Sequence, residues 1–397
     1  MVLLPAAALA QGTPPAGPLA PPQLAESVNE FGFQLLRTLQ RAPAPAGSGP
    51  QNLFLSPPSV AWAFDMVLNG AGGATTAALA KTLQVPGWGL PELNAASLAL
   101  RRSLEAADPK VTIKVANSLW GKTGLEFFPD FLAAARNFYS AELAPLTTVE
   151  PINAWVSAAT QGKIPSILNP ENITPQTILV LVNALYFKGL WQRPFDPSRT
   201  APQAFHPQAG AERPVPMMSQ SGSYAYFEDS QVQAIRLPYG GGRLALVVVL
   251  PAANSSLKAF LDALDAARWR ALVSGLKNRP GQILLPRFKV EYGAELSEPL
   301  KAMGMEVAFT EAADFKKLAK VPPGWWVKIS SVRHKVFVEV NEEGTEAAAA
   351  TAISMLAGAA PPPQQPPFRM VVDRPFFAAL QDSQSGLLLF IGGVAAP

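Results

Sequence analysis

The stretch NEEGTEAAAATA, residues 341–352, decides how the rest of the chain is interpreted. It lies between a strand-like run, KVFVEV at 335–340, and a loop of small residues and prolines. Four successive alanines favour a helix, because alanine is the best helix former, and Glu346 would suit the first turn of one. The strand before the alanines and the loop after them argue against a helix, so the alanines need another explanation.

The composition indicates a globular protein with a large core. Of the 397 residues, 49% are hydrophobic and 15% are charged, which leaves ample apolar material to bury. The lysines and arginines behind the net charge of +3 are scattered. They form no basic stripe with interleaved aromatics, so we expect no nucleic-acid partner. The absence of cysteine excludes disulfides, thiolate catalysis and cysteine-based zinc sites.

The N-terminal residues 1–24 are interpreted as a leader followed by a proline-rich linker. The apolar run MVLLPAAALAQG ends in Ala8-Leu9-Ala10, the small-x-small pattern that precedes a signal-peptidase cut, but it lacks a basic start. The run is either a truncated signal peptide, which predicts a secreted, extracellular or periplasmic protein, or an alanine-rich tail. No other apolar run approaches 18 residues, so we expect no membrane span.

Hydrophobic periodicity predicts helices in the first third of the chain and strands from residue 111 onward. The predicted helices cover residues 25–40, 58–71, 76–85 and 91–107. The predicted strands cover residues 111–121, 177–187, 233–239, 243–251, 281–292, 326–340 and 385–394. The fold class is therefore α+β, with large mixed or antiparallel sheets.

The motifs of common enzymes and metal sites are missing from the sequence. The two histidines are His206 and His334, and no G-x-S-x-G elbow accompanies them. His334 lies within a strand pattern, which favours a buried structural histidine. There is no HExxH, no P-loop and no calcium loop, so we expect neither catalysis nor a metal or cofactor. The neighbouring Glu342 and Glu343 would point to opposite faces if they lie in a strand.

Five separated motifs follow one another in the order found in serpins, and together they resemble that family. They are NLFLSPPSVAWAF at 52–64, VNALYFKGLWQRPFD at 182–196, LPRFKVEY with LSEPLKAMGMEVAF at 285–309, NEEGTEAAAATA at 341–352, and RPFFAALQDSQSGLLLFIGGV at 374–394. The resemblance implies a single serpin domain at 25–397. It would have about nine helices, three β-sheets and an exposed reactive-centre loop at about 342–367. The proline- and alanine-rich composition suggests a bacterial member.

The resemblance also implies a function and a reason for the alanines. A serpin inhibits a secreted serine protease as a suicide substrate. The protease cuts the loop and is held as an acyl-enzyme while the loop's N-terminal side inserts into the largest sheet of the metastable, monomeric inhibitor. Small side chains suit such an insertion. Strand alternation places Thr345, Ala347, Ala349 and Thr351 inward and Glu346, Ala348 and Ala350 outward, with Glu342 and Gly344 completing the hinge.

The family's spacing places the scissile bond at Gly358-Ala359, although Leu356, Met355 or Ala357 would be alternatives. Glycine offers a specificity pocket almost no apolar area, and the inserted PPPQQPP at 361–367 leaves the register of the loop's second half open. No lysine or arginine lies between Gly344 and Phe368. This favours an elastase-, chymotrypsin- or subtilisin-like target over a trypsin-like one.

Two groups of residues match serpin positions that control loop entry. Ser56, Ser59, Asn183 and His334 match the shutter beneath the central strands. Trp191, Arg287 and Glu342 match the breach where insertion starts. For the second group, Trp191 could simply be a core residue, and Arg287 with Glu342 could be a surface ion pair worth under about 1 kcal/mol. A non-inhibitory serpin-fold chaperone or binding protein is the alternative function, although its members tend to carry bulky, charged or proline residues at the hinge.

Overall fold

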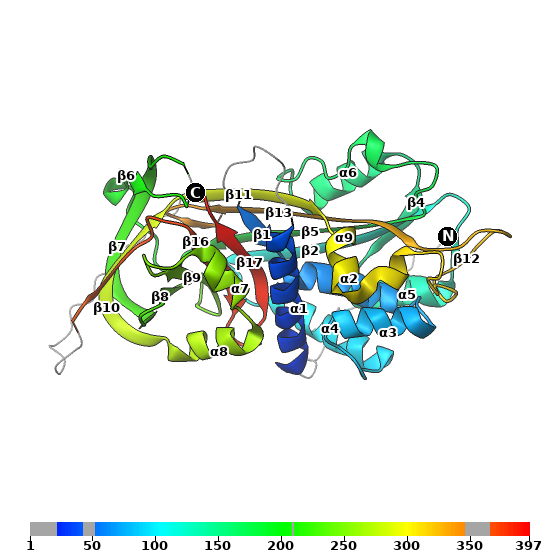
Figure 1. Cartoon of the computed structure of the whole chain (residues 1–397), viewed down its shortest axis with the longest axis horizontal. Helices are drawn as coiled ribbons and strands as arrows, with labels where there is room; N and C mark the ends of the chain where they lie inside the picture. The colour runs from blue at the N-terminus through cyan, green and yellow to red at the C-terminus, as the bar shows by residue number, and fades with distance from the viewer. Residues whose placement is uncertain (1–21, 43–51, 209, 346–365) are drawn as a thin grey trace, which may run out of the picture.

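The computed structural model describes residues 22–42, 52–208, 210–345 and 366–397 (Figure 1). In these residues it shows nine α-helices and three β-sheets, which agrees with the predicted numbers of helices and sheets. The α-helices are α1 (Pro22–Arg41), α2 (Pro57–Leu68), α3 (Gly73–Thr82), α4 (Leu90–Glu105), α5 (Pro129–Tyr139), α6 (Val149–Ala159), α7 (Leu257–Asp262), α8 (Ala266–Gly275) and α9 (Ser297–Leu300). Four shorter helical turns are Pro170–Asn172, Pro197–Arg199, Lys301–Met305 and Glu306–Phe309.

The central sheet has six strands and runs along the long axis of the molecule in Figure 1. Its order is β11 (Phe288–Glu295), β13 (Ile329–Val340), β14 (Gly344–Thr345), β5 (Leu179–Leu190), β2 (Val111–Lys122) and β4 (Glu142–Leu146). Helix α2 packs on one face of β2 and β5, and α6 packs on the same two strands from the other face (Figure 1). Both faces of the sheet are therefore covered, and β5 is buried along nearly all its length.

The largest sheet has nine strands and lies toward the left in Figure 1. Its order is β1 (Leu53–Leu55), β17 (Leu388–Val394), β16 (Phe376–Asp382), β9 (Leu244–Pro251), β8 (Val232–Pro238), β7 (Arg213–Glu228), β10 (Lys277–Pro286) and β15 (Phe368–Val371), with β6 (Ala201–Phe205) on β7. The third sheet pairs β12 (Ala319–Lys320) with β3 (Glu126–Phe127) at the opposite end (Figure 1).

Helix α2 joins the core to the central sheet, and its sequence explains its position. Ser56 caps its N-terminus by accepting a hydrogen bond from the Ser59 backbone, and two prolines follow in the first turn, where no backbone N–H is lost. Every residue of the helix is buried, so it lies inside the molecule instead of on its surface.

Each predicted strand is present, with one correction, but several further strands were not predicted. The run at 281–292 was predicted as one strand, but the chain breaks at Arg287 into β10 and β11, which belong to different sheets. Periodicity could not show the break, because both halves have strand-like composition. The strands not predicted include β1, β3, β4, β6, β12, β15 and β16, together with β7, which at sixteen residues is the longest strand of all. The sequence of β7 explains why it was missed. Its prolines and its SQSGSY segment have the composition of a loop.

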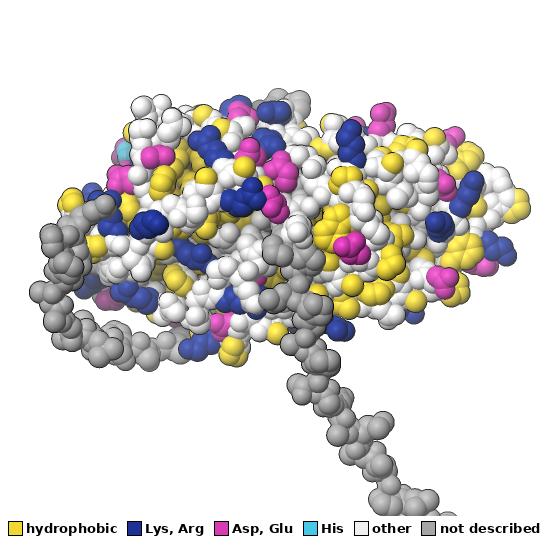
Figure 2. Space-filling model, turned by 90° about the horizontal axis from the view of Figure 1, so that it is seen from below, with side chains coloured by type: hydrophobic (Ala, Val, Ile, Leu, Met, Phe, Trp, Pro, Cys, Tyr) yellow, Lys and Arg dark blue, Asp and Glu magenta, His cyan; other side chains and the backbone are white. Residues whose placement is uncertain are grey.

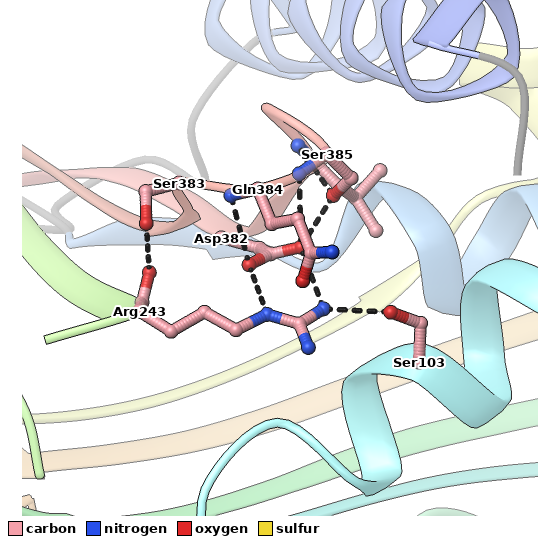
Figure 3. A network of polar contacts seen from close by, with 7 residues as sticks. Ser103, Arg243, Asp382, Ser383, Gln384 and Ser385 are labelled. Carbon is pink, nitrogen blue, oxygen red and sulfur yellow. Dashed lines mark hydrogen bonds and ion pairs between the residues drawn. The ribbon is translucent and has the colours of Figure 1, made fainter. Parts of the chain in front are cut away.

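A buried ion pair holds two hairpins of the largest sheet to helix α4 (Figure 3). Arg243 donates to the Asp382 carboxylate from Nε at 2.8 Å and from Nη2 at 3.1 Å, and it also donates to Ser103 Oγ at 2.8 Å. Ser385 Oγ donates to the same carboxylate at 2.6 Å. The Asp382 side chain is inaccessible to solvent, so these donors compensate for the loss of water around its charge.

Candidate functional site

The central sheet is closed over most of its length and open at one end. Strands β5 and β13 pair directly, in parallel, from Leu179 with Ile329 to Leu185 with Val336. Beyond this point the two strands separate. Strand β14 occupies the gap, with Thr345 paired to Gly189 of β5 on one side and to Val340 of β13 on the other. The first residues of the predicted reactive loop are therefore already a strand of this sheet.

Gly344 lies at a position that only glycine can occupy. Its φ angle is +148°, in a region that other residues rarely adopt. A Cβ atom placed on it would overlap the Gly189 carbonyl oxygen and would lie 2.8 Å from the Leu190 Cα. The close approach of the two backbones thus depends on the missing side chain.

The Thr345 side chain points into the core beneath the sheet. It is 2% exposed and shares a 2.7 Å hydrogen bond with the Tyr239 hydroxyl. The Tyr239 ring stacks on Trp191 with centroids 4.2 Å apart. Burial raises the pKa of Tyr239 well above its usual value, so its hydroxyl keeps its proton and can serve as donor or acceptor. Sequence reasoning missed Tyr239, because it ends an ordinary strand pattern.

The three predicted breach residues come together next to β14. The Trp191 indole N–H donates to the Asn341 carbonyl at 2.9 Å, and its backbone N–H donates to the Glu343 carbonyl at 2.9 Å. Arg287 Nε lies 2.8 Å from both oxygens of Glu342. Trp191 is buried, as its core interpretation required, but it also fixes the backbone that leads into β14.

The interpretation of Arg287 and Glu342 as a surface ion pair is wrong for the carboxylate. The Glu342 side chain is 6% exposed, whereas that of Arg287 is 46% exposed. Burial alone would raise the pKa of Glu342, but hydrogen bonds from Arg287 and Thr200 together with the Arg287 charge leave the pKa below its usual value. Glu342 and Glu343 form a bend between two strands, so the strand-alternation argument does not apply to them.

The four predicted shutter residues also lie together, buried beneath β5 and β13. His334 Nε2 accepts a hydrogen bond from the Ser56 backbone N–H at 3.1 Å, and Nδ1 contacts Asn183 Oδ1. Ser59 Oγ donates to the same Asn183 oxygen at 3.4 Å. Desolvation lowers the pKa of His334 to about 3, so the ring is neutral at physiological pH. The predicted buried histidine is confirmed.

The same cluster contains amide groups without a protein partner. Asn117 on β2 lies directly opposite Asn183 on β5. Among the residues that the structure describes, neither the Asn183 Nδ2 nor either side-chain polar atom of Asn117 has a hydrogen-bond partner. Unpaired buried amides are costly, so this part of the sheet has polar atoms that a new neighbour could satisfy. Asn117 was not predicted from the sequence.

The far end of the predicted loop is held at the edge of the largest sheet. Strand β15 pairs in parallel with β10, from Phe368 with Gly281 onward. Arg279 of β10 donates from Nε and Nη2 to the Pro366 carbonyl at 3.0 and 2.9 Å. Between the two held ends, other predicted residues lie outside the described residues: Glu346, Ala347, Ala348, Ala349, Ala350, Thr351, Met355, Leu356, Ala357, Gly358 and Ala359.

The described residues contain neither a candidate metal site nor a candidate membrane-spanning helix. No group of three or more histidine, aspartate or glutamate side chains in this part of the chain is arranged to hold a metal ion. None of its helices is both long and apolar enough to cross a membrane. His206 lies far from His334 in the sequence and contacts Glu212 on the surface.

Comparisons with known proteins agree with the fold. The profile of the family Serpin (serine protease inhibitor) matches residues 26–397. The leukocyte elastase inhibitor of Bos taurus is 35% identical over 391 residues, covering 94% of this chain and 100% of that protein, and Bos taurus serpin B8 is 34% identical over 386 residues. The native state of the thermophilic serpin tengpin superposes with a TM-score of 0.84 at 28% identity, covering 94% of both chains.

The chain belongs to the serpin family. This confirms the resemblance drawn from the five motifs, and it places the chain in a family of protease inhibitors. The curated relatives named above are cattle proteins. They give no support to the bacterial source suggested by composition, nor to secretion.

Proposed function

We propose that this serpin inhibits serine proteases as a suicide substrate whose cleaved loop inserts between β5 and β13. These two strands belong to the six-stranded central sheet, so the expectation of insertion into the largest sheet was wrong, because the nine-stranded sheet is larger. The observation that carries the proposal is β14, which already pairs with both strands at the open end of the sheet. A strand that continues from Thr345 would extend this pairing simply by separating β5 from β13. Each added residue would gain ladder hydrogen bonds, worth about 0.5 to 1.5 kcal/mol net apiece.

The register of β14 predicts where each later residue would lie. Thr345 pairs with Gly189 in antiparallel fashion, so every further loop residue would oppose the β5 residue one position earlier. Ala347 would then oppose Phe187 and Ala349 would oppose Leu185, both of which face the main core. Directly opposed residues share a face of the sheet, so an inserted side chain here must fit against packed apolar groups.

This register explains why four alanines occur together. Ala350 would oppose Ala184, which belongs to a second apolar cluster with Ile152 and Val156 of α6. The face of the inserted strand that was expected to point outward is therefore covered by α6 over this stretch. Both faces need small side chains, so small residues at every second position would not be enough for insertion. Glu346 would oppose the half-buried Lys188, where its charge has both water and a basic partner.

Thr351 would arrive opposite Asn183, beside the shutter. A hydroxyl there could accept from the unpaired Asn183 Nδ2. Insertion would thereby compensate for the contacts that β5 and β13 lose when they separate. The shutter and breach assignments are part of this proposal.

The same count gives the length of the inserted strand. Residue 355 would oppose Leu179, the first residue of β5, and the proposed bond Gly358-Ala359 lies three residues further on. The protease serine oxygen would attack the Gly358 carbonyl and form an ester, while Ala359 leaves as a free amine. Inhibition results if insertion is faster than hydrolysis of this ester. The absence of lysine and arginine from the loop favours elastase-, chymotrypsin- or subtilisin-like targets.

The wider assignments belong to the same proposal. Residues 25–397 would act as one monomeric domain, which makes a covalent complex with a secreted protease and needs no cofactor. Residues 1–24 would direct secretion. The alternative of a non-inhibitory chaperone or binding protein is disfavoured by the run of alanines.

The direct test is incubation with a panel of serine proteases, followed by denaturing electrophoresis. We expect an SDS-resistant complex, and mass spectrometry of the released C-terminal peptide would identify the cleaved bond. Ala347→Arg should convert the inhibitor into a substrate, because a charge beneath the sheet slows insertion. Glu346→Gln changes the adjacent, outward-facing position without setting a like charge opposite Lys188, and it should retain most of the inhibition. Unchanged stoichiometry in Ala347→Arg would contradict the predicted register.

A further inference from the structure

Three large hydrophobic side chains in the described residues are conspicuously exposed, and all three lie at the end of the molecule opposite the predicted loop. Phe128 is 37% exposed, Trp325 36% and Trp326 47%. They flank the small sheet of β3 and β12, at the right-hand end of Figure 1. In Figure 2 hydrophobic and basic side chains lie side by side at this end. A surface on which large apolar side chains gather is suited to contact with a partner.

Lys122 connects the tryptophans to the end of the central sheet. Its Nζ lies 4.8 Å from the centre of the Trp325 ring and donates to the Pro175 carbonyl. Its backbone N–H donates to the Ile178 carbonyl at 2.8 Å. Ile178 immediately precedes β5, and its own N–H donates to Ser330 Oγ of β13 at 2.9 Å. Trp325 is therefore tied to the place where β5 and β13 both begin.

We propose that Trp325 and Trp326 form a docking surface for the apolar surface of the captured protease. This inference rests on the proposed function, because it uses the position at which the inserted strand would end. Residue 355 would lie beside Leu179, and residue 358, which carries the ester, would lie about 10 Å further along at roughly 3.3 Å per residue. The attached protease is thus delivered to the end of the sheet where Trp325 and Trp326 lie.

The tryptophans would hold the protease after the chemistry is complete. They play no part in loop cleavage, because the intact loop leaves the sheet at the opposite end, and they are not needed for insertion. Their contact stabilises the final complex alone and so slows its breakdown. Trp325 is held in place by the Lys122 cation, so little side-chain freedom is lost when it is buried.

The experiment compares the unmodified inhibitor with Trp325→Ala/Trp326→Ala and with Phe128→Ala. Phe128 occupies the N-cap position of α5 without a side-chain cap hydrogen bond, so alanine removes no cap there. Its backbone N–H donates to the Leu318 carbonyl at 3.1 Å instead of to the start of β5 or β13, so it serves as a matched exposed aromatic. Covalent complexes with an elastase- or chymotrypsin-like protease are purified, and the release of active protease is followed over days. We expect the double variant to release protease about tenfold faster, with unchanged association rate and stoichiometry. Phe128→Ala should behave as the unmodified protein.

Equal release rates from all three complexes would overturn the proposal. It would also be overturned if the unmodified inhibitor sedimented as a dimer and the double variant as a monomer, since the tryptophans would then join two copies of this chain. If the unmodified protein forms no covalent complex with any protease, the proposed function itself fails, and that result is distinct from equal release rates. Unchanged melting temperatures of the free variants verify that both fold.

Discussion

At the scale of single residues, Asp65 is the most unusual side chain in the protein. It lies in the middle of the buried helix α2 and is 1% exposed. Its Oδ2 accepts a hydrogen bond from Ser97 of α4 at 3.2 Å, and the hydroxyl of Tyr139 in α5 joins the same polar cluster through Asn94. Desolvation raises the pKa of Asp65 to about 7, despite the opposing effect of the Ser97 bond.

This pKa predicts a stability that falls as the pH rises. The unfolded carboxyl loses its proton near pH 4, whereas the folded one keeps it until about pH 7. Between these values the free energy of unfolding should decrease by about 1.4 kcal/mol per pH unit. Asp65→Asn keeps a hydrogen-bonding side chain of the same shape without the charge, so it should remove this slope and stabilise the protein by a few kcal/mol at pH 8.

Urea denaturation of both proteins from pH 4 to pH 8 measures the difference. Other titrating groups contribute equally to the two proteins, so the difference isolates Asp65. A constant difference across this range would show that Asp65 does not titrate as described.

Gly344 gives a second prediction at this scale. Gly344→Ala combines an unfavourable φ angle with a clash against the backbone of Gly189 and Leu190, so β14 should leave the sheet and inhibition should slow. Gly87→Ala is the matched control, since Gly87 also has a positive φ of 86° but an added Cβ meets nothing within 4 Å. We expect a stability loss of about 1 to 2 kcal/mol for the control and more for Gly344→Ala, measured by thermal unfolding. Equal losses would mean that the clash is relieved at no cost.

Residue identities alone could locate part of the site. His334 was predictable as a buried histidine because it interrupts an apolar strand, and the two groups of gate residues followed from the family motifs. The burial of Glu342 was not predictable, because it depends on Arg287 and Thr200, which come from separate parts of the chain. The unpaired amide of Asn117 likewise appears only once β2 and β5 are in register.

At the scale of elements, the shutter joins β5, β13 and the start of α2. Asn183 accepts from Ser59 and contacts His334, so Asn183→Ala leaves both buried groups without this partner, at about 1 to 3 kcal/mol. That loss falls on the closed sheet, so the variant should accept a loop from itself or a neighbour on mild heating. Native gels after incubation below the melting temperature would show latent monomer or polymers. If Asn183→Ala stays monomeric and fully inhibitory, Asn183 does not control the opening of the sheet.

Long elements were predictable and their junctions were not. Helices α1 to α4 and strands β2, β5, β9, β13 and β17 have a clear apolar signal. It is periodic where one side of the element meets a packed layer and continuous where both sides do, as in α2, β9 and β17. The change of sheet at Arg287 leaves no signal in a run that is strand-like on both sides. The sequence also could not predict which strands pair. The pairing of β14 is an example, because this strand is only two residues long and leaves no pattern to detect.

At the scale of the whole molecule, the open end of the central sheet predicts metastability. The cleaved protein should contain about ten more strand residues than the intact protein, 346–355, with their ladder bonds and buried area. We expect the cleaved form to melt at a far higher temperature than the intact form. Differential scanning calorimetry before and after limited cleavage of the loop measures this, and equal melting temperatures would favour a non-inhibitory serpin.

One continuous segment holds both ends of the loop. Strand β10 pairs with β15 and supplies Arg279 for the Pro366 carbonyl, while Arg287, directly after β10, binds Glu342 at the loop's start. The spacing between the two ends is thus set by residues 277–295 and not by the loop itself. Residues 346–365 can accordingly be exchanged as a cassette, within the limits that an inserting strand places on residues 346–355. A library of substitutions at 356–360 would therefore redirect the inhibitor to new proteases while the rest of the fold stays unchanged.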